Sequence, residues 1–256
     1  MDFFICQPLA QVKVCGIIQI TLYKKAITVK EITIAPSDFA FLFDESPWAF
    51  HQKYVSGIKR PPLILPKIFN IIDGAIKDKY ANEDFTKISQ HLPQATLRTS
   101  DKWIKSKPII NPKYDLSVQI IGKIDGYLEY QDGSKAIIDF KTSEINEKYA
   151  GKYNRQLHSY CYGVMNPDNN NCLSLDNLTD PGLLVFEPNE FSIDYNCKAR
   201  LLGELKWQSF KLDIEWFESF IKEEVIPLLA GSEPQPPTDD PYWKYLQQFG
   251  FEYEQE

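Results

Sequence analysis

Hydrophobic and polar positions along the chain follow two different periods, and each period predicts its own kind of element. Residues 3–34 alternate loosely between apolar and polar side chains, which predicts two strands. From Pro66 to Tyr80, isoleucines and a tyrosine recur four residues apart, which predicts a helix with one apolar stripe. Strand and helix patterns mixed along one chain favour an α/β architecture.

Capping residues place further helices. Ser37 is the predicted N-cap of a helix that runs to Phe43. Ser46 followed by Pro47 predicts a second start, with serine at the N-cap and proline at the first helical position, and Gly57 ends that helix. Two later helices, the second of them amphipathic, are predicted at residues 147–165 and 211–230.

The rest of the chain contains less regular segments. Residues 81–116 show neither period and are predicted to be irregular. The Asn- and Asp-rich stretch 165–180 predicts a surface loop, and residues 182–188 predict a buried strand. We find no internal repeat and no long linker. We therefore expect one domain over residues 1–256, with a core at about 35–240, N-terminal strands at 1–34 and a tail at 241–256.

A predicted hairpin carries charged residues inside its apolar runs. Its first strand is expected to run from Val118 to Tyr130, with Asp125 on the face opposite the apolar side chains. In the second strand, Asp139 and Lys141 are two residues apart and therefore share a face. A second acid-x-Lys triplet, Glu204 to Lys206, lies in a segment that looks helical and follows no such strand.

The turn of this hairpin decides whether the two aspartates meet. A two-residue loop at Asp132 and Gly133 would separate them by the thickness of the sheet. A three-residue loop from Gln131 to Gly133 places Asp125 directly opposite Asp139, and Gly133 then occupies the position that requires a left-handed backbone. Two carboxylates whose Cβ atoms lie about 5 Å apart repel each other unless a cation lies between them, which favours a divalent ion with oxygen ligands. The alternative is an ordinary hairpin with charges on its solvated face.

Three motifs in order along the chain resemble the PD-(D/E)XK nuclease superfamily. They are Gly122 to Asp125, Asp139 to Lys141, and Gln156 to Tyr160. The pattern is most similar to the RecB-like exonuclease branch, which includes the CRISPR-associated exonucleases, and it covers about residues 35–240. The resemblance implies a restriction-endonuclease-like fold, with a mixed central sheet flanked by helices.

The same resemblance implies a metal-dependent nuclease, most simply a DNA exonuclease, that hydrolyses phosphodiester bonds with Mg²⁺ or Mn²⁺. Its metal ligands would be Asp73, Asp125, Asp139 and the main-chain carbonyl of Phe140. Lys141 would orient or deprotonate the attacking water, or stabilise the transition state. The nucleic-acid strand would be positioned by Gln156 and Tyr160.

Two departures from the family pattern stand out. The family commonly has a histidine ligand on an earlier helix, whereas this chain has Asp73 on the apolar stripe, with Asp78 and His91 as rivals. Many relatives also bind an iron–sulfur cluster through cysteines, but Ser46 stands where the first could be and none occurs near the C-terminus. We therefore expect no iron–sulfur cluster. The five scattered cysteines are expected to be reduced thiols.

Charge and hydropathy limit the partners. The net charge of −7 does not indicate a nucleic-acid binder, so contact with DNA, more than RNA, would depend on local clusters. The candidates are Lys59 with Arg60, and Lys102 with Lys105 and Lys107. Apolar stretches fall short of the roughly 20 residues that cross a bilayer. The residues after Met1 lack a basic region followed by an apolar run and a cleavage site, so we expect no signal peptide. We expect a cytoplasmic protein without a membrane partner. The alternatives are an inactive nuclease-fold subunit and an unrelated α/β protein that binds a small ligand.

Overall fold

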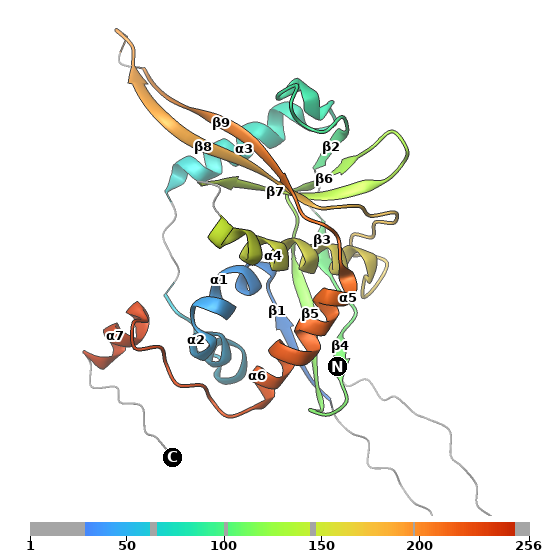
Figure 1. The fold of residues 1–256 in the computed structure, drawn as a ribbon, viewed down its shortest axis with the longest axis vertical. Helices are drawn as coiled ribbons and strands as arrows, with labels where there is room; N and C mark the ends of the chain where they lie inside the picture. The colour runs from blue at the N-terminus through green and yellow to red at the C-terminus, as the bar shows by residue number, and fades with distance from the viewer. Residues whose placement is uncertain (1–28, 62–65, 100–101, 144–146, 197, 249–256) are drawn as a thin grey trace, which may run out of the picture.

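The structure is a computed structural model that describes residues 29–61, 66–99, 102–143, 147–196 and 198–248, with residues 147–150 as main chain only. Helices flank two mixed β-sheets in the described chain, which confirms the α/β class expected from the sequence (Figure 1). Most of the predicted N-terminal strands and the end of the tail lie outside the described residues.

The first sheet is organised around β5 (Leu116–Lys123). Its neighbours are β1 (Lys30–Ile34), β3 (Trp103–Lys105) and β4 (Ile109–Asn111). β1 pairs with β5 in parallel, whereas β3 and β4 pair with it in antiparallel orientation. The prediction that residues 81–116 are irregular is therefore wrong. The strands there are only three or four residues long, which is too short for a period of two to be visible.

The second sheet has five strands. In their order across the sheet they are β2 (Thr96–Thr99), β6 (Gly126–Glu129), β7 (Lys135–Thr142), β8 (Gly182–Ile193) and β9 (Ala199–Ser209). β7 and β8 are parallel, and the other neighbours are antiparallel. The predicted strand at 182–188 is confirmed as the start of β8. The segment from Glu204 to Lys206 is a strand and not the predicted helix, because β8 supplies the partner for its main chain.

One stretch of chain joins the two sheets. The single strand predicted from Val118 to Tyr130 is wrong, since it breaks at Ile124 and Asp125, where β5 ends and β6 begins. The chain leaves the first sheet at this point and enters the second (Figure 1). Gly126 makes the crossing possible, because a Cβ atom there would lie 2.5 Å from the main-chain oxygen of Arg98 on β2.

The helices mostly follow the predicted patterns. They are α1 (Pro36–Glu45), α2 (Pro47–His51) with a π turn (Gln52–Ser56), α3 (Lys67–Tyr80), a 3₁₀ turn (Phe85–Lys87), α4 (Glu147–Met165), α5 (Ile214–Phe220) with a π turn (Ile221–Val225), α6 (Ile226–Ala230) and α7 (Pro241–Gln247). Ser46 caps α2 by accepting a hydrogen bond from the Ala49 N–H, and Gly57 ends the following turn with a φ of 75°. The N-cap predicted at Ser37 is wrong. The N-cap is Ala35, two residues earlier, because Pro36 suits the first helical position.

Apolar side chains form two main core clusters, one on each side of β7. The larger fills the space between the first sheet, α1, α4 and the α5–α6 segment, and the smaller lies between the second sheet and α3. Ile137 belongs to the larger cluster and Ile138 to the smaller. β7 is thus covered on both faces, so the charged residues that follow Ile138 on this strand enter a largely apolar environment.

α3 is held loosely by comparison. None of its residues is buried, and only Ile76 and Tyr80 from its predicted apolar stripe pack against the smaller cluster. Ile68, near its N-terminal end, is exposed. α3 can therefore present polar side chains to β7 without being buried itself.

Candidate functional site

Asp125 and Asp139 meet where β6 begins beside β7. The turn between these strands is the predicted three-residue loop. The Tyr130 N–H donates to the Ser134 carbonyl over 2.9 Å, and Gly133 has a φ of 83°. Gly126 pairs with Ile138 in the resulting register, so the next position outward sets Asp125 against Asp139. The predicted register is confirmed.

Two hydrogen bonds fix the Asp125 carboxylate. One oxygen accepts the main-chain N–H of Phe140 over 2.9 Å, and the other accepts from the ammonium group of Lys77 over 2.7 Å. Phe140 was expected to offer its carbonyl to a metal, and its N–H is the group that contacts the Asp125 carboxylate. Asp125 is thereby tied to β7 on one side and to α3 on the other.

Asp139 is the most buried carboxylate of the site, with 3% of its surface exposed. Its pKa is raised to about 6, first by burial and then by the charge of Asp125 and a hydrogen bond with it, while Lys141 opposes the rise. The Lys141 ammonium forms an ion pair with Asp139 and lies 5.5 Å from the centre of the Tyr153 ring. Asp139 and Lys141 share a face of β7, as their spacing predicts.

α4 places Gln156 and Tyr160 at the same location. Both side chains are buried, and the Gln156 amide donates to the Tyr160 hydroxyl over 3.3 Å. The pKa of Tyr160 is raised, first by burial and then by the charge of Asp139. Tyr160 also packs near Gly122, where an added Cβ would lie 3.6 Å from its ring. The three sequence motifs therefore converge.

Asp73 is connected to the site by Lys77, a residue that the sequence patterns did not predict as part of it. The Lys77 ammonium donates to Asp73 over 2.9 Å as well as to Asp125, so it bridges a carboxylate of α3 and one of the β5–β6 junction. Burial lowers the pKa of Lys77, but Asp125 and Asp73 outweigh this and the net pKa is raised. The only sequence signal was the four-residue spacing from Asp73 to Lys77, which also fits an ordinary solvated helix pair.

The rival ligands lie apart from this cluster. Asp78 and His91 are both exposed, the latter in the loop before β2. The expected basic clusters are mixed in character. Arg60 pairs with the buried Asp240, and Lys105 pairs with Asp168 over 3.1 Å. The remaining members, Lys59, Lys102 and Lys107, are exposed.

The carboxylate and amide oxygens of this cluster suit Mg²⁺ or Mn²⁺ as ligands. Two lysine ammonium groups, however, already pair with the carboxylates. Asp73 Oδ1 and Gln156 Oε1 are buried oxygen atoms that accept no hydrogen bond, and hard divalent cations prefer oxygen ligands. Yet within the described ranges no three His, Cys, Asp or Glu side chains converge as a metal site. The Lys77 ammonium lies between Asp73 and Asp125, and Lys141 is paired with Asp139. The positive charge in this cluster thus comes from lysine ammonium groups.

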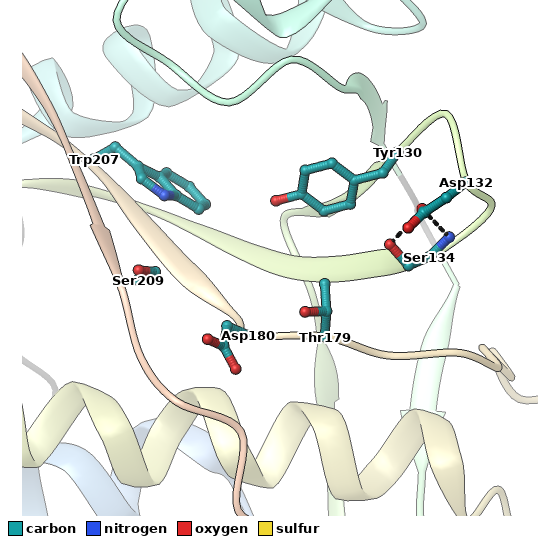
Figure 2. Close-up of a pocket in the computed structure, with 7 residues that line it drawn as sticks. All are labelled: Tyr130, Asp132, Ser134, Thr179, Asp180, Trp207 and Ser209. Carbon is teal, nitrogen blue, oxygen red and sulfur yellow. Dashed lines mark hydrogen bonds between the residues drawn. The ribbon is translucent and has the colours of Figure 1, made fainter.

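A separate pocket of about 320 Å³ opens beside the turn between β6 and β7 (Figure 2). Its lining residues are Tyr130, Asp132, Ser134, Thr179, Asp180, Trp207 and Ser209. Both carboxylates already bond the main chain, Asp132 to the Ser134 N–H and Asp180 to the Leu212 N–H, each over 2.9 Å. None of the motif residues lines this pocket. We therefore assign the candidate site to the aspartate cluster.

In the part of the chain that the structure describes, no helix has the length and apolarity needed to cross a bilayer. No protein-family model matches the chain, and no curated protein matches it in sequence. The crystal structure of the protein SSO0001 is similar, with a TM-score of 0.43 and 15% sequence identity, and the match covers 78% of each chain. A likeness of this degree carries no argument about activity.

Proposed function

We propose that this protein is a metal-dependent nuclease of the PD-(D/E)XK type that hydrolyses phosphodiester bonds in DNA. One observation carries the proposal: Asp125 and Asp139 meet at the β6–β7 junction, with Lys141 beside Asp139. A buried carboxylate such as Asp139, beside a second carboxylate and a lysine, is costly for a chain to keep without a function. A role in cleaving a polyanion such as DNA would explain why the chain keeps these charged residues together.

Asp73, Asp125 and Asp139 would hold Mg²⁺ or Mn²⁺, with the main-chain carbonyl of Phe140 as a further oxygen donor. When bound, the ion activates the attacking water and stabilises the negative charge that develops on the scissile phosphate. The buried Oδ1 of Asp73, which accepts no hydrogen bond, supports this assignment, because a cation would satisfy it.

The other residues of the site act on water and substrate. Lys141 places a positive charge next to Asp139, where it orients the attacking water and stabilises the phosphate during reaction. Gln156 has a buried carbonyl oxygen without a hydrogen-bond donor, and it positions the nucleic-acid strand together with Tyr160. Attack by water breaks one P–O bond and leaves a phosphate monoester and a free hydroxyl group.

A basic and aromatic surface near the site supports a nucleic-acid substrate. Trp103 on β3 is 56% exposed and pairs with Lys123, the last residue of β5 and two positions before Asp125. The Lys123 ammonium lies 5.5 Å from the centre of the Trp103 ring. An exposed aromatic ring can stack on a base, and the lysine beside it can contact the phosphate. This surface therefore suits binding of a nucleic-acid strand.

The experiment measures cleavage of end-labelled single- and double-stranded DNA with Mn²⁺ and with EDTA. We expect Mn²⁺-dependent hydrolysis that falls by at least about a hundredfold in Asp125→Asn and in Lys141→Met, in line with loss of charge stabilisation. Lys206→Met is the matched control, since Lys206 belongs to the second acid-x-Lys triplet, on β9. Activity that persists in Asp125→Asn would overturn the proposal.

A second candidate function is a nuclease-fold subunit that binds nucleic acid or a protein without cutting. The bridge from Lys77 to Asp73 and Asp125 favours it, because an ammonium group already neutralises two of the three carboxylates. DNA binding by the wild-type protein without any cleavage in Mn²⁺ would identify this alternative.

A further inference from the structure

The ammonium group of Lys77 is held in place by charge. It lies 2.9 Å from an oxygen of Asp73 and 2.7 Å from an oxygen of Asp125, both distances typical of charge-assisted hydrogen bonds. Only 27% of the Lys77 side chain is exposed. Two carboxylates from distant parts of the chain thus share one cation.

We propose that Lys77 is a tethered cation that holds the place of a divalent metal ion between Asp73 and Asp125, so that metal binding must displace its ammonium group. The inference rests on the proposed function, because it assumes that these carboxylates are metal ligands. It assigns Lys77 a positioning role that none of the three motifs predicts.

The arrangement explains how the metal-free cluster stays folded. Asp125 lies next to Asp139 and shares Lys77 with Asp73, so without Lys77 only Lys141 would oppose these negative charges. Lys77 adds the second positive charge at the side of the cluster that faces α3. Two ammonium groups among the three carboxylates leave little net charge, so the carboxylates can keep their positions without a metal ion.

Displacement of the ammonium group is feasible because little holds the rest of the residue. α3 has no buried residue, and the lysine stem has four flexible carbons. The Phe140 ring offers an alternative contact, with its centre 5.7 Å from the Lys77 ammonium. A metal ion and Lys77 thus compete for the same oxygens, and removal of the lysine charge should tighten metal binding.

The test is calorimetric titration of Mn²⁺ into metal-free wild-type protein, Lys77→Met and Lys77→Arg, with thermal melting of each in EDTA. We expect Lys77→Met to bind Mn²⁺ at least about tenfold more tightly than wild type, the usual scale for groups in direct contact. We also expect it to melt at a lower temperature without metal. Lys77→Arg keeps the charge and should bind Mn²⁺ no more tightly than wild type.

Lys79→Met is the matched control, since Lys79 lies on the same helix and contacts the Tyr80 ring instead of the carboxylates. It should leave Mn²⁺ affinity and metal-free melting unchanged. If wild type binds Mn²⁺ and Lys77→Met binds it equally or more weakly, the tethered-cation role is overturned while the nuclease proposal stands. If wild type and Lys77→Met both fail to bind Mn²⁺, both proposals fall.

Discussion

The Asp125 carboxylate accepts a hydrogen bond of 2.9 Å from the main-chain N–H of Phe140. This contact joins the β5–β6 junction to the strand that carries Asp139 and Lys141. It takes the place of a strand pairing, because β6 begins only at Gly126. The geometry of the site therefore depends on how closely the chain passes β2 at Gly126.

Gly126→Ala tests this close approach. The added Cβ would lie 2.5 Å from the main-chain oxygen of Arg98, and a strand backbone cannot move aside as a flexible side chain can. We expect the free energy of unfolding, measured by urea denaturation, to fall by about 1–3 kcal/mol, as in other overpacked sites.

The matched substitution is Gly74→Ala on α3, where no atom lies within 4 Å of the added Cβ. It should raise the free energy of unfolding by up to about 1 kcal/mol, because alanine favours a helix more than glycine does. Equal unfolding curves for Gly126→Ala and wild type would mean that β2 does not pass so close to β6.

The contributions of Lys141 and Asp139 to the free energy of unfolding should be strongly coupled. Lys141→Met leaves the Asp139 carboxylate buried without its ion-pair partner, so we expect a loss of about 1–3 kcal/mol by urea denaturation in EDTA. Removal of one partner from a fully buried ion pair would destabilise the protein more, but 20% of the Lys141 side chain is exposed. The double variant Asp139→Asn/Lys141→Met should recover most of this loss. Additive effects of the two substitutions would argue against a direct pair.

The centre of the site was predictable because short-range chemistry determines it. Gly133 can adopt the left-handed backbone of a three-residue turn, and this turn sets Asp125 against Asp139. The period of two then puts Asp139 and Lys141 on one face. A four-residue spacing on a helix brings Gln156 to Tyr160 in the same way.

Features that depend on the rest of the fold were not predictable. The apolar pattern continues through Ile124, so nothing local shows that the chain changes sheets there; the close approach of Arg98 to Gly126 decides it. Lys77 resembles any lysine on a solvated helix face until α3 is placed over Phe140. β9 resembles a helix locally and becomes a strand because it pairs with β8.

His158 should make stability depend on pH. It is fully buried in α4, with Nδ1 2.8 Å from the Asn154 carbonyl and Nε2 accepting the Asp213 N–H over 2.9 Å, so it is neutral. Burial lowers its pKa, and the Asn154 bond and nearby acids only partly offset this. Below about pH 6.5 the unfolded chain binds the proton more readily than the folded one, so stability falls as pH falls.

His158→Gln keeps an acceptor for Asp213 and removes the titration. Thermal melting at about pH 7.5 and about pH 5.5 should show a smaller drop for the variant than for wild type. Other groups titrate in both proteins, including Asp139, whose raised pKa acts in the opposite direction, and they cancel in the comparison. A constant difference in melting temperature between the two proteins would contradict a neutral, buried His158.

The distal part of the β8–β9 hairpin should contribute little to global stability. The end of this hairpin extends away from the rest of the chain (Figure 1), and its two strands stay paired beyond Glu187 and Glu204. Its apolar residues Phe191 and Ile193 are 64% and 68% exposed. An isolated two-stranded ribbon is at best marginally stable in water.

Replacing residues 189–202 with Asn-Gly would join the paired residues Pro188 and Gly203 through a two-residue turn. We expect the free energy of unfolding to stay within about 0.5 kcal/mol of wild type, as for other surface changes. Trp207→Ala, within the body of the hairpin, should instead cost about 3 kcal/mol or more, because this ring packs against Gly182 and Phe85. Hydrogen exchange of the intact protein should show the amides of 189–202 exchanging well before those of β7. Slow exchange there, or a truncated chain that unfolds like Trp207→Ala, would mean that the distal hairpin is part of the cooperative core.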